Sequence, residues 1–239
     1  ERQASRMAAK RPDVIVAGLG AVGGAAAWQL AARGLSVLGL DRHRPPHDQG
    51  SSHGETRITR TAIGEGDRFV PLVRRADALI DSLADRAGRP LRLACGGLFI
   101  GAAGGTTTMH GRPGFIAATA DTARRFGVPH QILSPAEVRA RFPAFHPADD
   151  DLCYFEPGAG LLFPERIVAA QLDAAAALGA ELRYDEPLVG FETIAGGVRV
   201  TTARGTVEGG ALVLAAGAWT QNLAPARPVS PPQDAVLPG

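Results

Sequence analysis

The glycines near the start of the chain have the spacing of a loop that holds the phosphates of a dinucleotide. Gly18, Gly20 and Gly23 follow the apolar run 13–17 and open a stretch that is typical of a helix. The first glycine permits a tight turn, the second lets the backbone approach a pyrophosphate, and the third permits close helix–strand packing. The helix N-terminus then directs N–H groups and the positive end of its dipole toward the phosphates.

An acidic residue stands where such a site meets the ribose. Asp41 closes a second apolar run, residues 35–40. A carboxylate at this position accepts hydrogen bonds from ribose hydroxyls and repels a 2′-phosphate. The combined pattern predicts a site for an unphosphorylated adenosine dinucleotide, and both FAD and NAD fit it. A glycine turn that binds nothing is the structural alternative.

A second chemically rich segment, residues 51–60, reads SSHGETRITR. A guanidinium there could grip a carboxylate through paired hydrogen bonds. Its local structure is open: Ser52 and Glu55 have capping-box spacing, so residues 51–55 could begin a helix. Arg57 and Arg60 share a face on a helix but not on a strand, and a solvated charged face is the plain alternative.

The apolar periodicity of the rest of the sequence predicts the helices and strands that would position these residues. An amphipathic helix is expected over 69–87, and Ser134 and Glu137 form a capping-box pattern before a helix over 135–141. Residues 155–160 are interpreted as a turn cluster. The sheet begun by 13–17 and 35–40 is expected to resume only at 211–215. The other expected helices are 21–33, 114–126 and 164–178, and the other expected strands are 91–100, 181–184, 187–193, 198–202 and 205–208.

Composition narrows the classes of function. The 239 residues carry a net charge of +1, so no basic field favours nucleic acid or an anionic membrane. Apolar runs are too short to span a bilayer, and two cysteines, Cys95 and Cys153, give no disulfide framework. Both cysteines are expected to be small buried apolar residues. A soluble cytoplasmic protein with a small-molecule partner and no metal is expected. His43, His47, His110, His130 and His146 form no ligand cluster and receive no role.

The chain resembles the FAD-dependent monomeric sarcosine oxidase and N-methyltryptophan oxidase family, within the D-amino acid oxidase-like group. The resemblance runs from about Asp13 to Leu223. It is most specific at PPH (45–47), GSSHGETRITR (50–60), GEG (64–66) and VPL (70–72), and FEP (155–157) and AAGAW (215–219) match as well. It implies a Rossmann-like FAD-binding domain with a parallel central sheet (α/β), plus an incomplete, mainly antiparallel substrate domain (α+β).

The resemblance also implies a reaction and roles for particular residues. A hydride equivalent would pass from the carbon beside the nitrogen of a small N-methyl amino acid to flavin N5, and O₂ would then yield H₂O₂. His53 and Arg57 would lie beside the flavin ring, where a cation stabilises the reduced, anionic flavin, and Arg60 would grip the substrate carboxylate. FAD would be held by Gly18, Gly20, Ala21, Val22, Gly23, Asp41, Arg42, Ser51, Ser52, Thr56, Arg57, Gly217 and Trp219.

The sequence also departs from the family. The family's flavin-linking cysteine, its oxygen-activating lysine and its second carboxylate-binding lysine would lie beyond this chain, and Lys10 is the only lysine here. A truncated or frameshifted frame with little oxidase activity is therefore expected. Strands near 91–101 and 187–208 should then lose their partners. The resemblance implies a monomer, but exposed sheet edges would allow the truncated chain to associate.

Domain boundaries follow from the same resemblance. The FAD-binding domain is expected over 13–90 and 155–223, the partial substrate domain over 91–154, with a leader at 1–12 and a disordered, proline-rich tail at 224–239. Three other functions stay open: a catalytically inactive FAD- or nucleotide-binding fragment, a glycine oxidase-like enzyme, and an NAD-dependent dehydrogenase.

Overall fold

The computed structural model describes residues 11–103 and 114–223. The chain divides into two compact units, the first comprising residues 1–53 and 171–239, and the second residues 54–170. Compactness does not identify which residues hold a cofactor, so the functional boundaries at 90, 91, 154 and 155 stay predictions. The expected tail at 224–239, most of the leader at 1–12, and His110 lie outside the described residues.

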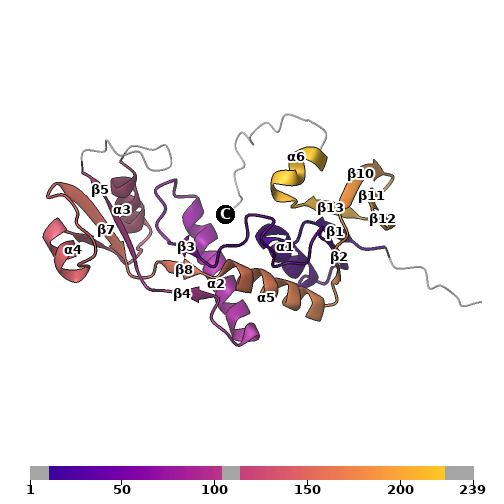
Figure 1. Cartoon of the computed structure of the whole chain (residues 1–239), viewed down its shortest axis with the longest axis horizontal. Helices are drawn as coiled ribbons and strands as arrows, with labels where there is room; N and C mark the ends of the chain where they lie inside the picture. Colours follow the sequence, from indigo (N-terminus) through magenta and orange to yellow (C-terminus); the bar gives the residue numbers. More distant parts are fainter. Residues whose placement is uncertain (1–10, 104–113, 224–239) are drawn as a thin grey trace, which may run out of the picture. The chain divides into compact units, whose positions relative to one another are not determined.

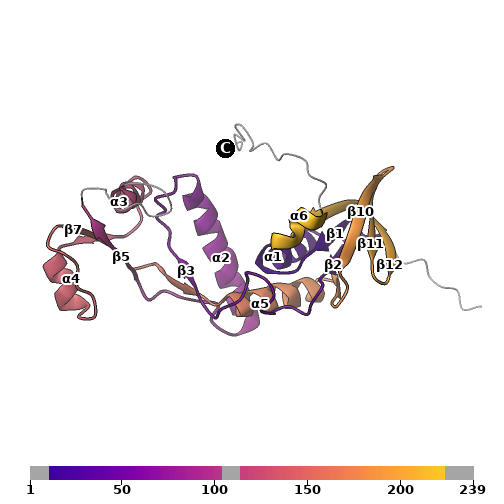
Figure 2. The same ribbon diagram turned by 45° about the horizontal axis from the view of Figure 1, so that its top comes forward.

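A parallel four-stranded sheet forms the centre of the first unit, with strand order β13-β1-β2-β9. Helix α1 (Ala21–Ala31) follows β1 and packs beside β1 and β2 (Figures 1 and 2). The expectation that the sheet resumes only at 211–215 is wrong, because β9 already pairs in parallel with β2. This strand has only three residues, two of them charged, so it lacks the apolar run of a central strand. The strands are β1 (Val14–Ala17), β2 (Val37–Leu40), β9 (Glu181–Arg183) and β13 (Ala211–Leu214).

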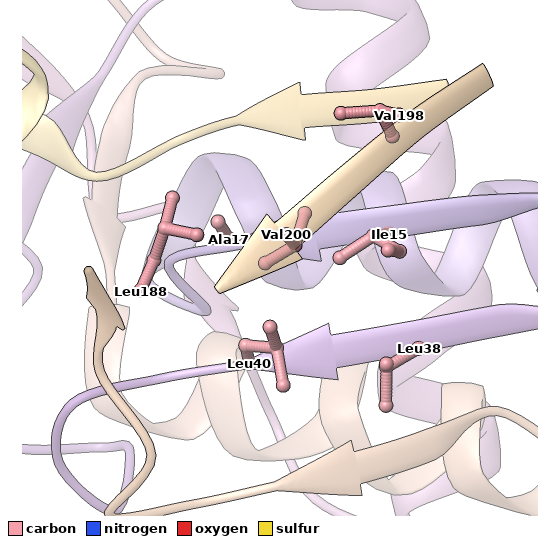
Figure 3. Close-up of a cluster of buried hydrophobic side chains, with 7 residues drawn as sticks. All are labelled: Ile15, Ala17, Leu38, Leu40, Leu188, Val198 and Val200. Carbon is pink, nitrogen blue, oxygen red and sulfur yellow. The ribbon is translucent and has the colours of Figure 1, made fainter. Parts of the chain in front are cut away.

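A second, antiparallel sheet covers one face of the parallel sheet. It consists of β10 (Leu188–Ile194), β11 (Gly197–Thr202) and β12 (Gly205–Gly209) in sequence order. Figure 3 shows the core between the two sheets, where Ile15 and Leu38 lie opposite Val198 and Val200. Because side chains alternate along a strand, Ile15 and Ala17 share this face of β1. The first unit therefore buries its central sheet between helix and sheet. A short 3-10 helix, η1 (Gly217–Trp219), and α6 (Thr220–Leu223) follow β13.

The second unit contains two three-stranded antiparallel sheets, with orders β3-β8-β4 and β5-β7-β6. Helix α3 packs on the second of these, where Phe115 and Ile116 contact a core that includes Tyr154. The strands are β3 (Arg57–Thr59), β4 (Arg92–Leu93), β5 (Gly97–Ala102), β6 (Gln131–Leu133), β7 (Asp151–Glu156) and β8 (Gly160–Leu162). The helices are α2 (Phe69–Ala87), α3 (Phe115–Arg125), α4 (Pro135–Arg141) and α5 (Pro164–Ala177), the last of which continues into the first unit.

Several expected elements are confirmed. Helix α2 has the expected bounds, and the capping box of Ser134 and Glu137 is present at α4. The turn expected within 155–160 is present at 157–158, between the end of β7 and the start of β8. The strands near 91–101 and 187–208 each have a partner among the described residues, since β4 pairs with β8, β5 pairs with β7, and β10 to β12 pair with one another; β4, β5, β10 and β12 lie at sheet edges.

Two aspartates on α2 should give the fold opposite dependences on pH. Burial raises the pKa of Asp77, whereas a hydrogen bond from Arg92 lowers the pKa of Asp81. A carboxyl group whose pKa is raised by folding stabilises the fold at pH values below its ordinary pKa. That contribution is lost as pH rises through the pKa of the folded state. A lowered pKa gives a contribution that is present above the ordinary pKa and is lost as pH falls through the folded-state pKa.

As pH rises from about 3 to 7, we therefore expect the stability of Asp77→Asn to increase relative to that of wild type. Over the same range, the stability of Asp81→Asn should decrease relative to that of wild type. Urea unfolding midpoints at several pH values measure both differences. Each variant is the control for the other, because both aspartates lie on one helix near Arg92. Parallel pH profiles for the two variants would contradict these assignments.

Candidate functional site

The glycine loop between β1 and α1 is packed so closely that side chains cannot be added. Gly18 has φ +91°, and a Cβ there would collide with the carbonyl oxygen of Ala215. A Cβ on Gly23 would collide with the carbonyl oxygen of Gly18. Both positions therefore need glycine because the loop, α1 and the end of β13 meet at van der Waals distance.

Asp41 ties this loop to the end of β2. The Leu19 N–H donates to its Oδ2 at 2.6 Å, and the His43 N–H donates to its Oδ1 at 2.9 Å. Asp41 is 8% exposed, so these charge-assisted bonds are made in a largely desolvated position. A carboxylate oxygen can accept more than one hydrogen bond, so both oxygens keep acceptor capacity for a ligand hydroxyl. Asp41 thus orders the loop whether or not a ligand is bound.

Asp41→Asn is therefore expected to destabilise the ligand-free protein. An amide retains one oxygen but turns an NH₂ group toward one of the two backbone donors. Losing a buried bond to a charged acceptor costs about 1.5–3 kcal/mol. Urea unfolding of the protein without added FAD measures this cost. Asp48→Asn is the control, since Asp48 lies exposed in the same connection. Equal stability of the two variants would show that Asp41 does not order the loop.

The segment that follows this connection contributes a hydroxyl at the start of α1. The Ala21 N–H donates to Ser52 Oγ at 3.0 Å, and a Cβ on Gly20 would lie 3.1 Å from the same oxygen. Ser52 therefore satisfies one N–H of the helix N-terminus, where phosphates bind in dinucleotide sites. In that contact the Ser52 oxygen is the acceptor, so its own O–H can still donate to an anion.

These groups line one pocket of about 460 Å³ in the first unit, a size typical of small-molecule sites. The predicted residues among its walls are Gly18, Gly20, Ala21, Val22, Asp41, Arg42, Ser51, Ser52, Gly217 and Trp219. Gly23 and His53 are not among its lining residues; Gly23 packs behind the wall, against Gly18. Ten residues from four separate stretches of sequence are thus brought together.

Sequence reasoning missed two histidines in this pocket. His43 and His47 both line it, their ring centroids lie 5.0 Å apart, and His47 Nε2 lies 3.5 Å from Asp41 Oδ1. Pro187 and Leu188 also line it, although the sequence gave them no role. The available signal was position: ligands of open parallel sheets bind beyond the carboxyl ends of the strands, and both histidines follow β2.

The segment from residue 54 onward belongs to the second unit and is not helical at its start. The interpretation of residues 51–55 as a helix start is wrong, because Gly54 and Glu55 have φ values of 102° and 64°. Their N–H groups donate to Glu165 Oε1 at 2.6 and 3.1 Å. A distant carboxylate thus replaces the local capping box. Thr56 then leads into strand β3.

The two arginines of this segment have different surroundings. Arg57 is exposed on β3, and its Nη1 donates to the carbonyl of Thr56 at 2.7 Å. Arg60 Nη2 donates to Glu65 Oε1 at 2.8 Å, and its guanidinium lies 5.4 Å from the ring centroid of Phe99 and 5.6 Å from that of Phe115. Among the described residues, the buried Nε of Arg60 has no hydrogen-bond partner. An unpaired buried donor is costly to the folded state.

The cysteines differ from each other. Cys153 is buried as expected, and burial raises the pKa of its thiol. The expectation that Cys95 is buried is wrong, since it is exposed beside Gly96. Within residues 11–103 and 114–223, no helix is long and apolar enough to cross a membrane, and no group of three His, Cys, Asp or Glu is arranged to hold a metal ion.

Comparison with known proteins places the site in context. The family described as FAD dependent oxidoreductase matches residues 13–237. Monomeric sarcosine oxidase of Streptomyces avermitilis is 41% identical over 211 residues, covering 88% of this chain and 53% of that protein. N-methyl-L-tryptophan oxidase of Yersinia pestis is 37% identical over 219 residues, covering 92% and 57%. The chain spans about half the length of the curated relatives it matches.

A solved structure, that of NikD, is also similar to this chain. NikD, described as an unusual amino acid oxidase essential for nikkomycin biosynthesis, is 32% identical and superposes with a TM-score of 0.78. The superposition covers 89% of this chain and 53% of NikD. The described fold is therefore shared with an amino acid oxidase over most of this chain's length.

Proposed function

Because the chain belongs to the family of FAD dependent oxidoreductases, we propose that it binds FAD and serves in oxidising the C–N bond of a small N-methyl amino acid such as sarcosine or N-methyltryptophan. The observation that carries this proposal is the pocket of the first unit, in which the glycine loop, the start of α1 and Asp41 meet. FAD is the cofactor of this family.

The pocket residues fit the ADP portion of FAD. Gly18 and Gly20 leave backbone within reach of a pyrophosphate, since no Cβ intervenes. The first turn of α1 and the Ser52 hydroxyl supply donors for the phosphates. Asp41 accepts hydrogen bonds from the ribose hydroxyls. The remaining walls of the pocket include Arg42, Gly217 and Trp219. Thr56 contacts the cofactor further along the chain by analogy with the family.

The chemistry is divided between cofactor and protein. FAD, when bound, supplies an acceptor for a hydride equivalent from the carbon beside the substrate nitrogen, and O₂ is the final acceptor with release of H₂O₂. Arg60 binds the substrate carboxylate through its guanidinium, whose Nη2 also donates to Glu65. Arg57 supplies positive charge beside the reacting centre, with His53 next to the flavin ring, as the resemblance implies.

A second candidate is a FAD-binding protein without oxidase activity. Residues 11–103 and 114–223 contain no lysine, so these residues supply no ammonium group near the flavin. Both candidates share FAD binding and differ only in turnover. A glycine oxidase-like reaction differs in substrate, and an NAD-dependent dehydrogenase differs in cofactor.

One series of measurements separates these functions. The purified full chain is titrated with FAD and with NAD, and the FAD-loaded protein is then mixed anaerobically with sarcosine, N-methyltryptophan or glycine. The proposed enzyme binds FAD and loses its flavin absorbance with an N-methyl amino acid, and it releases H₂O₂ when air is admitted. Flavin that stays oxidised with all three amino acids assigns the chain to the non-catalytic class. Binding of NAD in preference to FAD contradicts both.

A further inference from the structure

A buried glutamate lies directly behind the segment that carries Arg60. Glu156 is the last residue of β7 and is 0% exposed. The Thr61 N–H donates to its Oε1 at 2.6 Å, and the Ala62 N–H donates to its Oε2 at 3.2 Å. The hydroxyl of Tyr154 also donates to Oε2 at 2.8 Å. A buried carboxylate is tolerated when donors surround it, and these three bonds satisfy that condition.

The strand geometry explains why Tyr154 reaches this carboxylate. Residues two apart on a strand point to the same face, so Tyr154 and Glu156 lie side by side on β7. Burial, and then the hydrogen bond to Glu156, raise the pKa of Tyr154, so its hydroxyl stays protonated and continues to donate. The Tyr154 ring also stacks on His130, with centroids 5.5 Å apart. Glu156 is therefore held in one position by its own neighbours.

Glu156 in turn fixes the backbone that follows Arg60. The Thr61 N–H belongs to the same planar peptide group as the carbonyl of Arg60, so its bond to Glu156 sets the orientation of that group. Before Arg60, the backbone is held by the pairing of β3 with β8, which ends at Thr59 opposite Gly160. The Thr59 hydroxyl also donates to the carboxylate of Asp77 on α2. Arg60 is thus anchored on both sides.

We propose that Glu156 is a positioning residue for Arg60, holding its guanidinium against the rings of Phe99 and Phe115 in the orientation in which it binds a substrate carboxylate. This inference rests on the proposed role of Arg60 in carboxylate binding. Glu156 acts through the backbone of residues 61 and 62 and does not contact the ligand, because it is fully buried and both of its oxygens already accept backbone N–H groups.

The test compares Glu156→Gln with a matched variant of another buried glutamate, Glu186→Gln. A glutamine at 156 turns an NH₂ group toward at least one of the three donors, so one anchoring bond is lost. Glu186 is 1% exposed and accepts the Thr202 hydroxyl at 2.8 Å in the first unit. It therefore matches Glu156 in burial and charge, but it has no bond to the segment that carries Arg60.

Two readouts are taken on the full chain loaded with FAD. Amide hydrogen exchange at Thr61 and Ala62, with the NMR resonance of the Arg60 Nε–H, reports the anchor itself. Titration with sarcosine, followed by the flavin spectrum, reports the ligand site. For Glu156→Gln we expect faster exchange at both amides, a shifted Arg60 resonance and an about tenfold weaker affinity for sarcosine, with an unchanged affinity for FAD. Glu186→Gln should lower the stability of the protein. It should leave amide exchange, the Arg60 resonance and the affinities for sarcosine and FAD as in wild type.

The outcomes separate this inference from the proposed function. The positioning role would be overturned if amide exchange and the Arg60 resonance in Glu156→Gln stay as in wild type. It would also be overturned if both change equally in Glu186→Gln. If wild type shows no saturable effect of sarcosine while the Arg60 resonance moves only in Glu156→Gln, the positioning role stands and the proposed substrate fails. Should Glu156→Gln not fold, Glu156→Asp keeps the charge but cannot span both amides, and the same two readouts apply.

Discussion

Replacement of Gly23 by alanine is expected to abolish FAD binding and to lower the stability of the first unit. A Cβ at this position would collide with the carbonyl oxygen of Gly18, which is backbone and cannot move aside without opening the phosphate loop. The loop, helix α1 and strand β13 would have to separate, and the close approach that a pyrophosphate needs would be lost. Titration with FAD, followed by quenching of its fluorescence, measures the effect.

The neighbouring glycine provides a matched control. A Cβ on Gly24 would lie 2.9 Å from Gln171 Oε1, the far end of a flexible side chain, so that contact can relax. Gly24→Ala should therefore retain FAD binding, and alanine also favours the helix by up to about 1 kcal/mol. Equal FAD affinities for the two variants would mean that the loop does not form the phosphate site.

The second large effect is expected at Arg60. Arg60→Lys keeps the positive charge but removes the planar fork and its contacts with the rings of Phe99 and Phe115. It also removes the buried Nε–H that has no partner among the described residues. Lysine cannot form the paired hydrogen bonds of the fork, and losing a hydrogen bond to a charged group costs about 1.5–3 kcal/mol, so sarcosine affinity should fall by about 10- to 100-fold.

FAD affinity separates this loss from general damage to the fold. It should be the same in Arg60→Lys as in wild type, because Arg60 is assigned to the substrate and not to the cofactor. Arg199→Lys is the control, since Arg199 pairs with Glu192 and Glu208 on the surface of the first unit. Sarcosine affinity that is unchanged in Arg60→Lys would assign the carboxylate site to another residue.

The parts of the structure that were predictable from sequence are those set by local pattern. The glycine spacing and Asp41 identified the strand–helix–strand unit, because each of those residues has a steric or electrostatic requirement of its own. Helix α2 has the expected bounds, since its apolar positions recur at helical spacing and Gly88, in the left-handed conformation, ends it. Local signals of this kind do not depend on distant partners.

What sequence could not supply are the interactions between distant segments. Glu165 captures the N–H groups of Gly54 and Glu55, and this outcompetes the capping-box spacing of Ser52 and Glu55. Glu156 looked like part of a turn because Pro157 and Gly158 follow it, whereas its bonds to Thr61 and Ala62 span more than 90 residues. Such pairs leave no periodic pattern along the chain.

His43 and His47 were missed for a related reason. A single histidine is more often structural than functional, so neither residue suggested a site by itself. Their position beyond the carboxyl end of β2, beside Asp41, places both in the pocket wall. The topology of the sheet, rather than the type of residue, was the useful signal.

Every proposed role rests on binding of the ADP portion of FAD in the pocket of the first unit. Competition during FAD titration of the full chain tests this claim directly, with ADP and FMN as the two competitors. ADP should displace FAD, since it carries the groups that Asp41, Ser52 and the glycine loop are assigned to bind, and FMN, which lacks the adenosine, should not. Displacement by FMN but not by ADP, or no saturable binding of FAD, would contradict the account.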